Sequence, residues 1–300
     1  MLLATGQARY ADLIERTLYN AVLAGVSLDG EEYFYANPLA SNGEPEHLHR
    51  GGCRRKPWHL VACCPPNVMR FVASLGHYVA TRDASGLQIH QYAPARIATA
   101  GLALRMETDY PWDGRVRLAF EEGTAGACTL ALRVPGWCAG ASARVNGGEA
   151  PGDVAGGYLR LDRAWSRGDL VELDLPMPAR CVEAHPWIES TRGCVAIERG
   201  PLVYCVEQAD HPGTRIADLE IDADAPLQSA WEPDILDGVT VIRARGWEVD
   251  TTAWRHRLYR PLGSAPPPPR RPVALHAIPY HAWANRESGA MRVWIPRAEN

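Results

Sequence analysis

The sequence lacks the signatures of several common site types. Lysine occurs once, as Lys56, and no glycine-rich loop precedes it, so neither a P-loop nor a lysine Schiff base is supported. G-x-S-x-G and G-x-G-x-x-G are both absent, which removes the basis for an α/β-hydrolase or dinucleotide site. The chain also has no C-x2-C pair and no H-E-x-x-H, so a self-contained zinc motif is weakly supported.

Long apolar runs and export signals are missing as well. No run of about 18 apolar residues occurs, so no membrane span is predicted, and residues 1–6 lack the features of a signal peptide. The 8 cysteines among 300 residues are too few and too irregular for a disulfide scaffold, and we expect reduced thiols in the cytoplasm. The net charge of −4 argues against a nucleic-acid or anionic-membrane surface built on bulk charge.

Hydrophobic spacing predicts helices in about the first 85 residues. The first helix is expected to bury an apolar stripe, with Asp12, Glu15 and Arg16 on its other face. That stripe comprises Tyr10, Leu13, Ile14, Leu18, Ala21 and Val22. A second amphipathic helix is predicted behind Pro65-Pro66, because proline is favoured at the first helical position. Its apolar face comprises Val68, Phe71, Val72, Leu75 and Val79. Residues 37–57, between the helices, are expected to form a loop.

After Gly86 the pattern changes to alternation, which predicts strands. The predicted strands cover residues 87–92, 115–120, 129–134, 158–161, 170–175, 194–198, 202–206, 273–278 and 291–295. Turn signals such as Asn146-Gly147-Gly148 and Arg167-Gly168-Asp169 separate them, which is typical of an antiparallel sandwich. The run Pro266–Pro269 predicts a stiff loop or linker. The fold class is therefore mixed α and β, and mainly β.

The segment Trp58-His59-Leu60-Val61-Ala62-Cys63-Cys64-Pro65-Pro66-Asn67 carries the most chemical content. Cys63 and Cys64 are predicted at a helix N-terminus, where the dipole favours anions and can lower a thiol pKa. Three interpretations stay open: two buried apolar residues, a pair of zinc ligands, or a nucleophile beside its neighbour. Nearby side chains that could add ligands are Cys53, His47, His49 and His59.

The other candidate residues have ordinary structural explanations. A general acid could be among Glu31, Glu32, Glu44 and Glu46, although solvated loop charges are the simpler interpretation. His90, His185, His276 and His281 lie in or beside strands and are expected to be structural. Tyr33, Phe34 and Tyr35 are expected in a core or a pocket wall, and Asp222 and Asp224 do not continue into an EF-hand pattern.

Four motifs together resemble glycoside hydrolase family 127, the β-L-arabinofuranosidase-like proteins. They are Ala8-Arg9-Tyr10-Ala11-Asp12 with Glu15-Arg16 and Tyr19-Asn20, then Phe34-Tyr35-Ala36-Asn37-Pro38-Leu39, then Cys63-Cys64-Pro65-Pro66-Asn67, and finally Ala277-Ile278-Pro279-Tyr280-His281-Ala282-Trp283-Ala284-Asn285-Arg286. The resemblance covers nearly the whole chain, and the Cys-Cys-Pro-Pro-Asn motif is its most specific part.

This resemblance implies the last helices of an (α/α)6 barrel followed by β-sandwich domains, divided as residues 1–85, 86–185 and 186–300. It also implies Zn2+-assisted retaining hydrolysis, in which Cys63 attacks the anomeric carbon and both Cys63 and Cys64 bind the metal. In the family, a glutamate and a cysteine that complete the zinc site precede the helix that opens this chain, as does the glutamate acid/base. The chain is thus expected to be a C-terminal portion with most of the barrel missing.

The leading functional hypothesis is a glycoside hydrolase of the β-L-arabinofuranosidase type acting on a carbohydrate substrate, with an incomplete site in this chain. The alternative is a non-catalytic β-sandwich protein with a vestigial helical segment that binds carbohydrate or a partner. Exposed apolar faces of an incomplete barrel would favour a homo-oligomer or aggregation.

Overall fold

The computed structural model describes residues 1–44, 52–60, 63–254 and 257–298. Its contacts divide the chain into two compact units. The first unit comprises Met1–Tyr19 and Ala62–Pro178, and the second comprises Asn20–Val61 and Ala179–Asn300. Each unit is therefore built from two stretches that are far apart in sequence. The boundaries 1–85, 86–185 and 186–300 stay a prediction.

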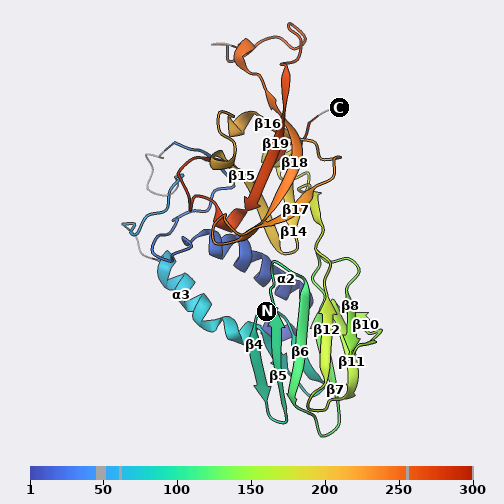
Figure 1. The fold of residues 1–300 in the computed structure, drawn as a ribbon. Coiled ribbons are helices and arrows are strands. Elements are labelled where there is room, and N and C mark those ends of the chain that lie inside the picture. The colour runs from blue at the N-terminus through green and yellow to red at the C-terminus, as the bar shows by residue number, and fades with distance from the viewer. Residues whose placement is uncertain (45–51, 61–62, 255–256, 299–300) are drawn as a thin grey trace. The chain divides into compact units, whose positions relative to one another are not determined.

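Within the described residues, α-helix occurs only in the first part of the chain, as the spacing predicts (Figure 1). The helices are α1 (Leu2–Thr5), α2 (Ala8–Arg16) and α3 (Cys64–Ser74), with a π-helical segment η1 (Thr17–Val22) after α2. Short 3-10 helices are η2 (Leu75–Tyr78), η3 (Glu189–Thr191), η4 (Gln208–Asp210), η5 (Ile216–Asp218), η6 (Thr252–Trp254) and η7 (Tyr280–Ala282). In this described part, no helix combines the length and apolar character needed to cross a bilayer.

The first unit contains two sheets, one of five strands in the order β10-β11-β7-β3-β2 and one of six in the order β4-β5-β6-β12-β8-β9 (Figure 1). Their strands are β2 (Ala80–Arg82), β3 (Gly86–Ile89), β4 (Ala95–Thr99), β5 (Leu102–Thr108), β6 (Arg115–Glu122), β7 (Ala127–Arg133), β8 (Ser142–Val145), β9 (Gly148–Glu149), β10 (Asp153–Ala155), β11 (Tyr158–Ala164) and β12 (Leu170–Asp174). The predicted antiparallel sandwich is confirmed, except that β3 and β7 pair in parallel.

The core of this sandwich follows from the alternation in the sequence. In β6, Val116 and Leu118 are buried, while Arg115 and Arg117, which alternate with them, face solvent. The buried side chains of both sheets form one apolar cluster, in which Leu132 of the five-stranded sheet joins the residues of β6 and β12. This burial supplies the main driving force for pairing the two sheets.

Two predicted turns hold one end of the six-stranded sheet. Asn146 and Gly147 connect β8 to β9 with φ of 52° and 80°, which is the left-handed pair that a two-residue hairpin requires. The Asn146 side chain also donates to Asp169 Oδ1 at 2.8 Å and accepts from the Leu170 N–H at 2.9 Å. The turn before β12 is therefore tied to the β8–β9 turn.

The second unit is built around a ten-stranded sheet, whose main path is β1-β20-β15-β19-β18-β16. Its strands are β1 (Ala40–Asn42), β13 (Ala179–Val182), β14 (Cys194–Arg199), β15 (Leu202–Glu207), β16 (Leu219–Ile221), β17 (Gln228–Glu232), β18 (Val239–Val249), β19 (Arg270–Pro279), β20 (Ala290–Arg292) and β21 (Ile295–Pro296). The long strands β18 and β19 form a hairpin, and Pro266–Pro269 lie in its connection, which confirms the predicted loop (Figure 1).

Helix α2 packs with the opposite face from the one predicted. Ala8, Ala11 and Glu15 are buried, whereas Leu13 of the predicted apolar stripe is 63% exposed. The expectation that Asp12 and Glu15 face solvent is wrong, because both carboxylates form ion pairs with a cation inside the first unit. The physical reason therefore lies in β7, more than a hundred residues away.

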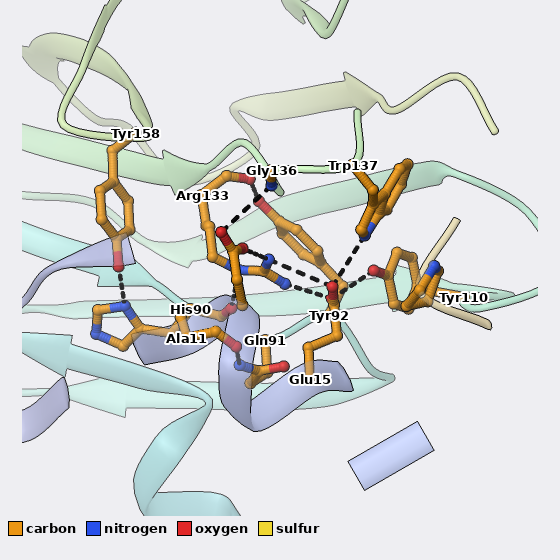
Figure 2. Close-up of polar contacts among 12 residues, drawn as sticks. Ala11, Glu15, His90, Gln91, Tyr92, Tyr110, Arg133, Gly136, Trp137 and Tyr158 are labelled. Atoms are coloured by element: carbon orange, nitrogen blue, oxygen red, sulfur yellow. Dashed lines mark hydrogen bonds and ion pairs between the residues drawn. The ribbon is translucent and has the colours of Figure 1, made fainter. Parts of the chain in front are cut away.

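That cation is Arg133, which is fully buried at the end of β7. Figure 2 shows its guanidinium directed at Glu15, with Tyr110 and Trp137 also reaching this carboxylate. Arg133 Nη1 binds Asp12 Oδ1 at 2.6 Å, and Trp137 Nε1 donates to Glu15 Oε2 at 3.0 Å. Burial opposes the charge of Arg133, but Glu15 raises the pKa of this guanidinium, so Arg133 stays charged.

Replacing Arg133 with Met should destabilise the protein strongly, because Glu15 would remain buried without its cation. We expect a loss of about 3–5 kcal/mol in the free energy of unfolding, measured by urea denaturation. The control is Arg105→Met, since Arg105 pairs with Glu121 at 3.2 Å but is 59% exposed. That change should cost no more than ~1 kcal/mol. Equal losses in the two variants would contradict this account of α2.

In the second unit, His276 of β19 lies between two carboxylates. Its Nδ1 is 3.6 Å from Asp210 Oδ1 and its Nε2 is 3.6 Å from Glu232 Oε1. Arg286 binds Asp210 at 2.6 Å, and Arg243 pairs with Glu232. Asp210, followed by Glu232 and against the effect of burial, raises the pKa of His276 above its ordinary value of 6.5. The protonated imidazole thus stabilises the folded state fully at pH values below its ordinary pKa. This contribution is lost as the pH rises through the raised pKa of the folded state.

Substituting His276 by Gln should therefore have a pH-dependent cost. The difference in unfolding free energy between wild type and variant should be larger at about pH 5.5 than at about pH 8.5. His185→Gln is the control, because it replaces an exposed side chain and should change the unfolding free energy by no more than about 0.5 kcal/mol at either pH. A pH-independent difference for His276→Gln would show that the imidazole charge contributes nothing.

Candidate active site

The Cys63-Cys64 pair lies at the N-terminus of α3, which confirms the predicted position. Cys63 is the N-cap, Cys64 is the first helical residue, and Pro65 and Pro66 follow (Figure 1). The Asn67 side-chain amide donates to the Cys63 carbonyl at 2.9 Å and so fixes the backbone of the cap. The Cys63 side chain is exposed and that of Cys64 is half-buried. One thiol is thus open to solvent while its neighbour is partly covered.

The separation of the two sulfurs fits a shared metal ion. Cys63 Sγ and Cys64 Sγ are 3.8 Å apart, and neither is in a disulfide. Two sulfurs that bind one tetrahedral zinc ion at about 2.3 Å lie about 3.8 Å apart by simple geometry. Thiolates are also ligands that zinc prefers. The pair already has the spacing of two corners of such a site.

The electrostatics of the pair differ from the expectation at a helix start. Burial, followed by the adjacent Cys63 sulfur, raises the pKa of the Cys64 thiol, whereas the helix position predicted a lowered pKa. Pro65 and Pro66 carry no N–H, so the first turn offers few donors to a thiolate. A second negative sulfur nearby further opposes ionisation. A cation beside the pair would oppose both effects and favour the Cys64 thiolate.

The nearby residues proposed as further ligands are engaged elsewhere or lie outside the described residues. Cys53 is buried and its thiol donates to the Gly43 carbonyl at 3.2 Å. The His59 ring lies edge-on to Tyr33 at 4.8 Å, with Nε2 3.2 Å from the Tyr33 carbonyl. Glu31 and Glu44 are exposed and Glu32 is half-buried, whereas Glu46, His47 and His49 fall outside the described residues. Across the described ranges, no group of three or more His, Cys, Asp or Glu side chains could hold a metal.

The aromatic run before the pair packs in the core of the second unit, as expected. Tyr33 and Phe34 are buried, and Phe34 stacks on Trp283 with ring centroids 4.9 Å apart. Arg55 lies over the Phe34 ring at 4.5 Å and donates to the carbonyls of Trp283 at 2.7 Å and Ala24 at 2.8 Å. Its burial lowers the pKa of Arg55 to about 10. Nothing in the charged run Arg54-Arg55-Lys56 marks Arg55 as the residue that is buried.

His90, His185 and the Asp222 carboxylate contact other side chains of the protein, and the structural role expected for the histidines stays a prediction. His90 is buried, with Nδ1 2.6 Å from the Tyr158 hydroxyl and Nε2 2.8 Å from Thr81 Oγ1. Burial lowers the pKa of His90 and of His281 to about 4, so both rings are neutral. His185 packs against Trp187, and Asp222 pairs with Arg245.

Comparison with known proteins assigns each part of the chain to one family. Models of the β-L-arabinofuranosidase GH127 catalytic domain, the GH127 middle domain and the glycoside hydrolase family 127 C-terminal domain match residues 1–77, 86–177 and 179–296. A non-reducing end β-L-arabinofuranosidase from Bifidobacterium longum subsp. longum is 36% identical over 97% of this chain and 46% of its own length.

Solved structures show the same relationship. A GH127 β-L-arabinofuranosidase from Geobacillus stearothermophilus T6 matches with a TM-score of 0.89 and 40% identity over 99% of this chain and 48% of its own. A structure described as a glycoside hydrolase matches with a TM-score of 0.91 and 37% identity over 100% of this chain and 50% of its own. The chain spans about half the length of the relatives it matches. It carries segments of the catalytic, middle and C-terminal domains of glycoside hydrolase family 127, and it belongs to that family.

Proposed function

We propose that this chain acts in the hydrolysis of β-L-arabinofuranosides, with retention of configuration and with Cys63 as the nucleophile. The observation that carries the proposal is the 3.8 Å spacing of the Cys63 and Cys64 sulfurs at the start of α3. The pair lies within the match to the GH127 catalytic domain, and the relatives of known name are β-L-arabinofuranosidases. The substrate is therefore proposed to be a carbohydrate with a terminal β-L-arabinofuranosyl residue.

Cys63 and Cys64 are proposed to hold a Zn2+ ion through their sulfur atoms. When bound, this ion would supply the positive charge that keeps both sulfurs deprotonated near neutral pH. The half-buried Cys64 suits a permanent ligand, whereas the exposed Cys63 is accessible to a sugar. Asn67 and the two prolines hold the backbone of the cap, so the direction of the Cys63 side chain is set by the helix start.

The proposed reaction has two displacements at the anomeric carbon. The Cys63 sulfur attacks C1, the C1–O bond breaks, and the aglycone oxygen takes its electron pair and a proton from a general acid. Water then attacks C1 from the same side as the departed aglycone, the S–C1 bond breaks, and the conjugate base takes a proton from the water. Cys63 returns as a thiolate, and two inversions give net retention.

The acid/base group and the remaining zinc ligands are proposed to come from a region that corresponds to the part of the longer relatives outside the match. The described residues contain no third metal-ligating group around the pair, and the relatives are about twice as long as the matched region. The chain is thus proposed to contribute the nucleophile and two ligands to a larger site. A cytoplasmic location is proposed as well, and the eight free thiols support it.

The exposed face of α3 favours a second candidate function. None of its described side chains is buried, and Met69 and Val72 are 70% and 54% exposed. An apolar helix face of this kind is typical of a surface that contacts another polypeptide. The second candidate is therefore a non-catalytic β-sandwich protein that binds a partner or a carbohydrate.

Hydrolysis of an aryl β-L-arabinofuranoside with added zinc separates the two candidates, when the chain is joined to the part of a family relative that lies outside the match. Cys63→Ser should abolish turnover, because a hydroxyl at that position is a far weaker nucleophile than a thiolate. Cys128→Ser, which removes a thiol from β7 in the sandwich, should leave turnover unchanged. Wild-type turnover no greater than that of Cys63→Ser would reject the enzyme and leave the binding protein.

Metal analysis tests the zinc proposal independently of turnover. After dialysis of the joined protein we expect about one zinc per molecule with wild-type cysteines and much less in Cys64→Ser, since one thiolate ligand is lost. The Cys128→Ser variant should retain the wild-type content. Substoichiometric zinc that is the same in all three proteins would rule out a metal site at the pair.

A further inference from the structure

A cavity with a mixed polar and apolar lining lies in the second unit. It is built from residues that the proposed hydrolysis does not use. It has a volume of about 420 Å³ and is bordered by β1, β20, η4 and η5. Strand β1 reaches it by pairing antiparallel with β20, with Asn42 opposite Ala290. We propose that this cavity binds a single neutral sugar residue, as a site separate from the cysteine pair.

Close backbone packing forms one wall of the cavity. A Cβ on Gly289 would lie 2.8 Å from the Cβ of Gln208, so only glycine lets η4 approach β20 here. A Cβ on Gly43 would likewise come within 2.9 Å of the Ala290 nitrogen. The glycines therefore bring β1 and Gln208 up to β20 and shape a hollow that larger residues would disrupt.

The lining includes an apolar part. Ile216 and Met291 are both almost fully buried, and Ala40, Ala217 and Ala290 lie beside them. A sugar ring presents C–H groups on its faces. Contact between these groups and apolar side chains removes apolar surface from water, which is favourable. A purely apolar ligand would instead leave the charged lining residues without water, which is costly.

Two amide side chains are held so that one polar atom of each stays available. Gln208 Nε2 donates to the carbonyls of His211 and Thr214, both at 2.8 Å. Asn42 Oδ1 accepts from the Glu44 N–H at 3.0 Å. These bonds fix both amide orientations, and within the described residues neither Gln208 Oε1 nor Asn42 Nδ2 makes a hydrogen bond. The cavity thus has an oriented acceptor and an oriented donor.

Charged side chains complete the set of donors and acceptors. Arg292 uses Nη1 to donate to the Ala217 carbonyl at 3.3 Å, which leaves the rest of its guanidinium for a ligand. Arg215 pairs with Asp218 at 3.6 Å, and Glu44 adds a carboxylate to the lining. Hydroxyl groups both donate and accept, so a sugar matches this mixture, whereas an anion would meet the Glu44 carboxylate.

Ligand-observed saturation-transfer NMR with L-arabinose as the probe tests the site. Wild-type protein should bind with a Kd of about 1 mM. Asn42→Asp keeps the oxygen that accepts from Glu44 but removes the free N–H donor, and Arg292→Gln removes the guanidinium. Each variant should weaken binding by roughly fivefold or more, because a hydrogen bond is lost.

Two controls separate this site from other effects. Arg144→Gln removes an arginine from β8 and Cys128→Ser removes a thiol from β7, both in the first unit, and each should leave the Kd unchanged. Thermal melting of each variant establishes that it is folded. Absence of saturation transfer to the sugar, or equal signals in all folded variants, would overturn the proposal. So would binding of inorganic phosphate, sensitive to Arg292→Gln, in place of the sugar.

Discussion

The buried ion pair between Arg133 and Glu15 is the constraint on which the first unit depends. A guanidinium and a carboxylate removed from water are each costly alone, so neither can be buried until both are in place. Arg133 comes from the sandwich and Glu15 from α2, and Trp137 and Tyr110 satisfy the remaining lone pairs of the carboxylate. Since apolar side chains could have filled the same space at similar stability, we infer that the pair chiefly fixes which face of α2 meets the sheet.

The cysteine site depends on a different kind of constraint, because its geometry is set within five residues. Adjacent positions at a helix start, two prolines and one asparagine amide place the sulfurs without help from distant parts of the chain. Ionisation of Cys64 is a separate question, since burial and the adjacent Cys63 sulfur raise its pKa. Local sequence can therefore bring two thiols together, and the charge that would favour the Cys64 thiolate is that of the zinc ion proposed above.

This contrast explains how much could be predicted from the sequence. The start of α3 and the alternating strands were predictable, because helix capping and sheet alternation act between near neighbours. The buried face of α2 was not, because the polarity of Glu15 suggests solvent and only Arg133 makes its burial favourable. The burial of Arg55 could not be predicted for the same reason. Hydrogen bonds to the carbonyls of Ala24 and Trp283 replace those that its guanidinium would make with water.

Topology was the second limit on prediction. The parallel pairing of β3 with β7 cannot be read from either strand, because alternation gives the faces of a strand and not the direction of its neighbour. Likewise β18, the longest strand in the described residues, was missed, since Arg243 and Arg245 interrupt its apolar pattern and are compensated by Glu232 and Asp222. In each case the missing information was a partner on or next to another strand.

The interleaved composition of the two units has a consequence for synthesis on the ribosome. Residues 20–61 leave the tunnel early, but the rest of their unit begins at residue 179. Phe34 and Arg55 cannot make their native contacts until Trp283 has been synthesised. Translation of the intervening residues takes on the order of 10–50 s. During that interval the first unit can fold, while the segment that carries Phe34 and Arg55 still lacks its partner Trp283. Cutting the gene at a single point therefore cannot yield two separately folding halves, because each unit needs residues from both sides of the cut.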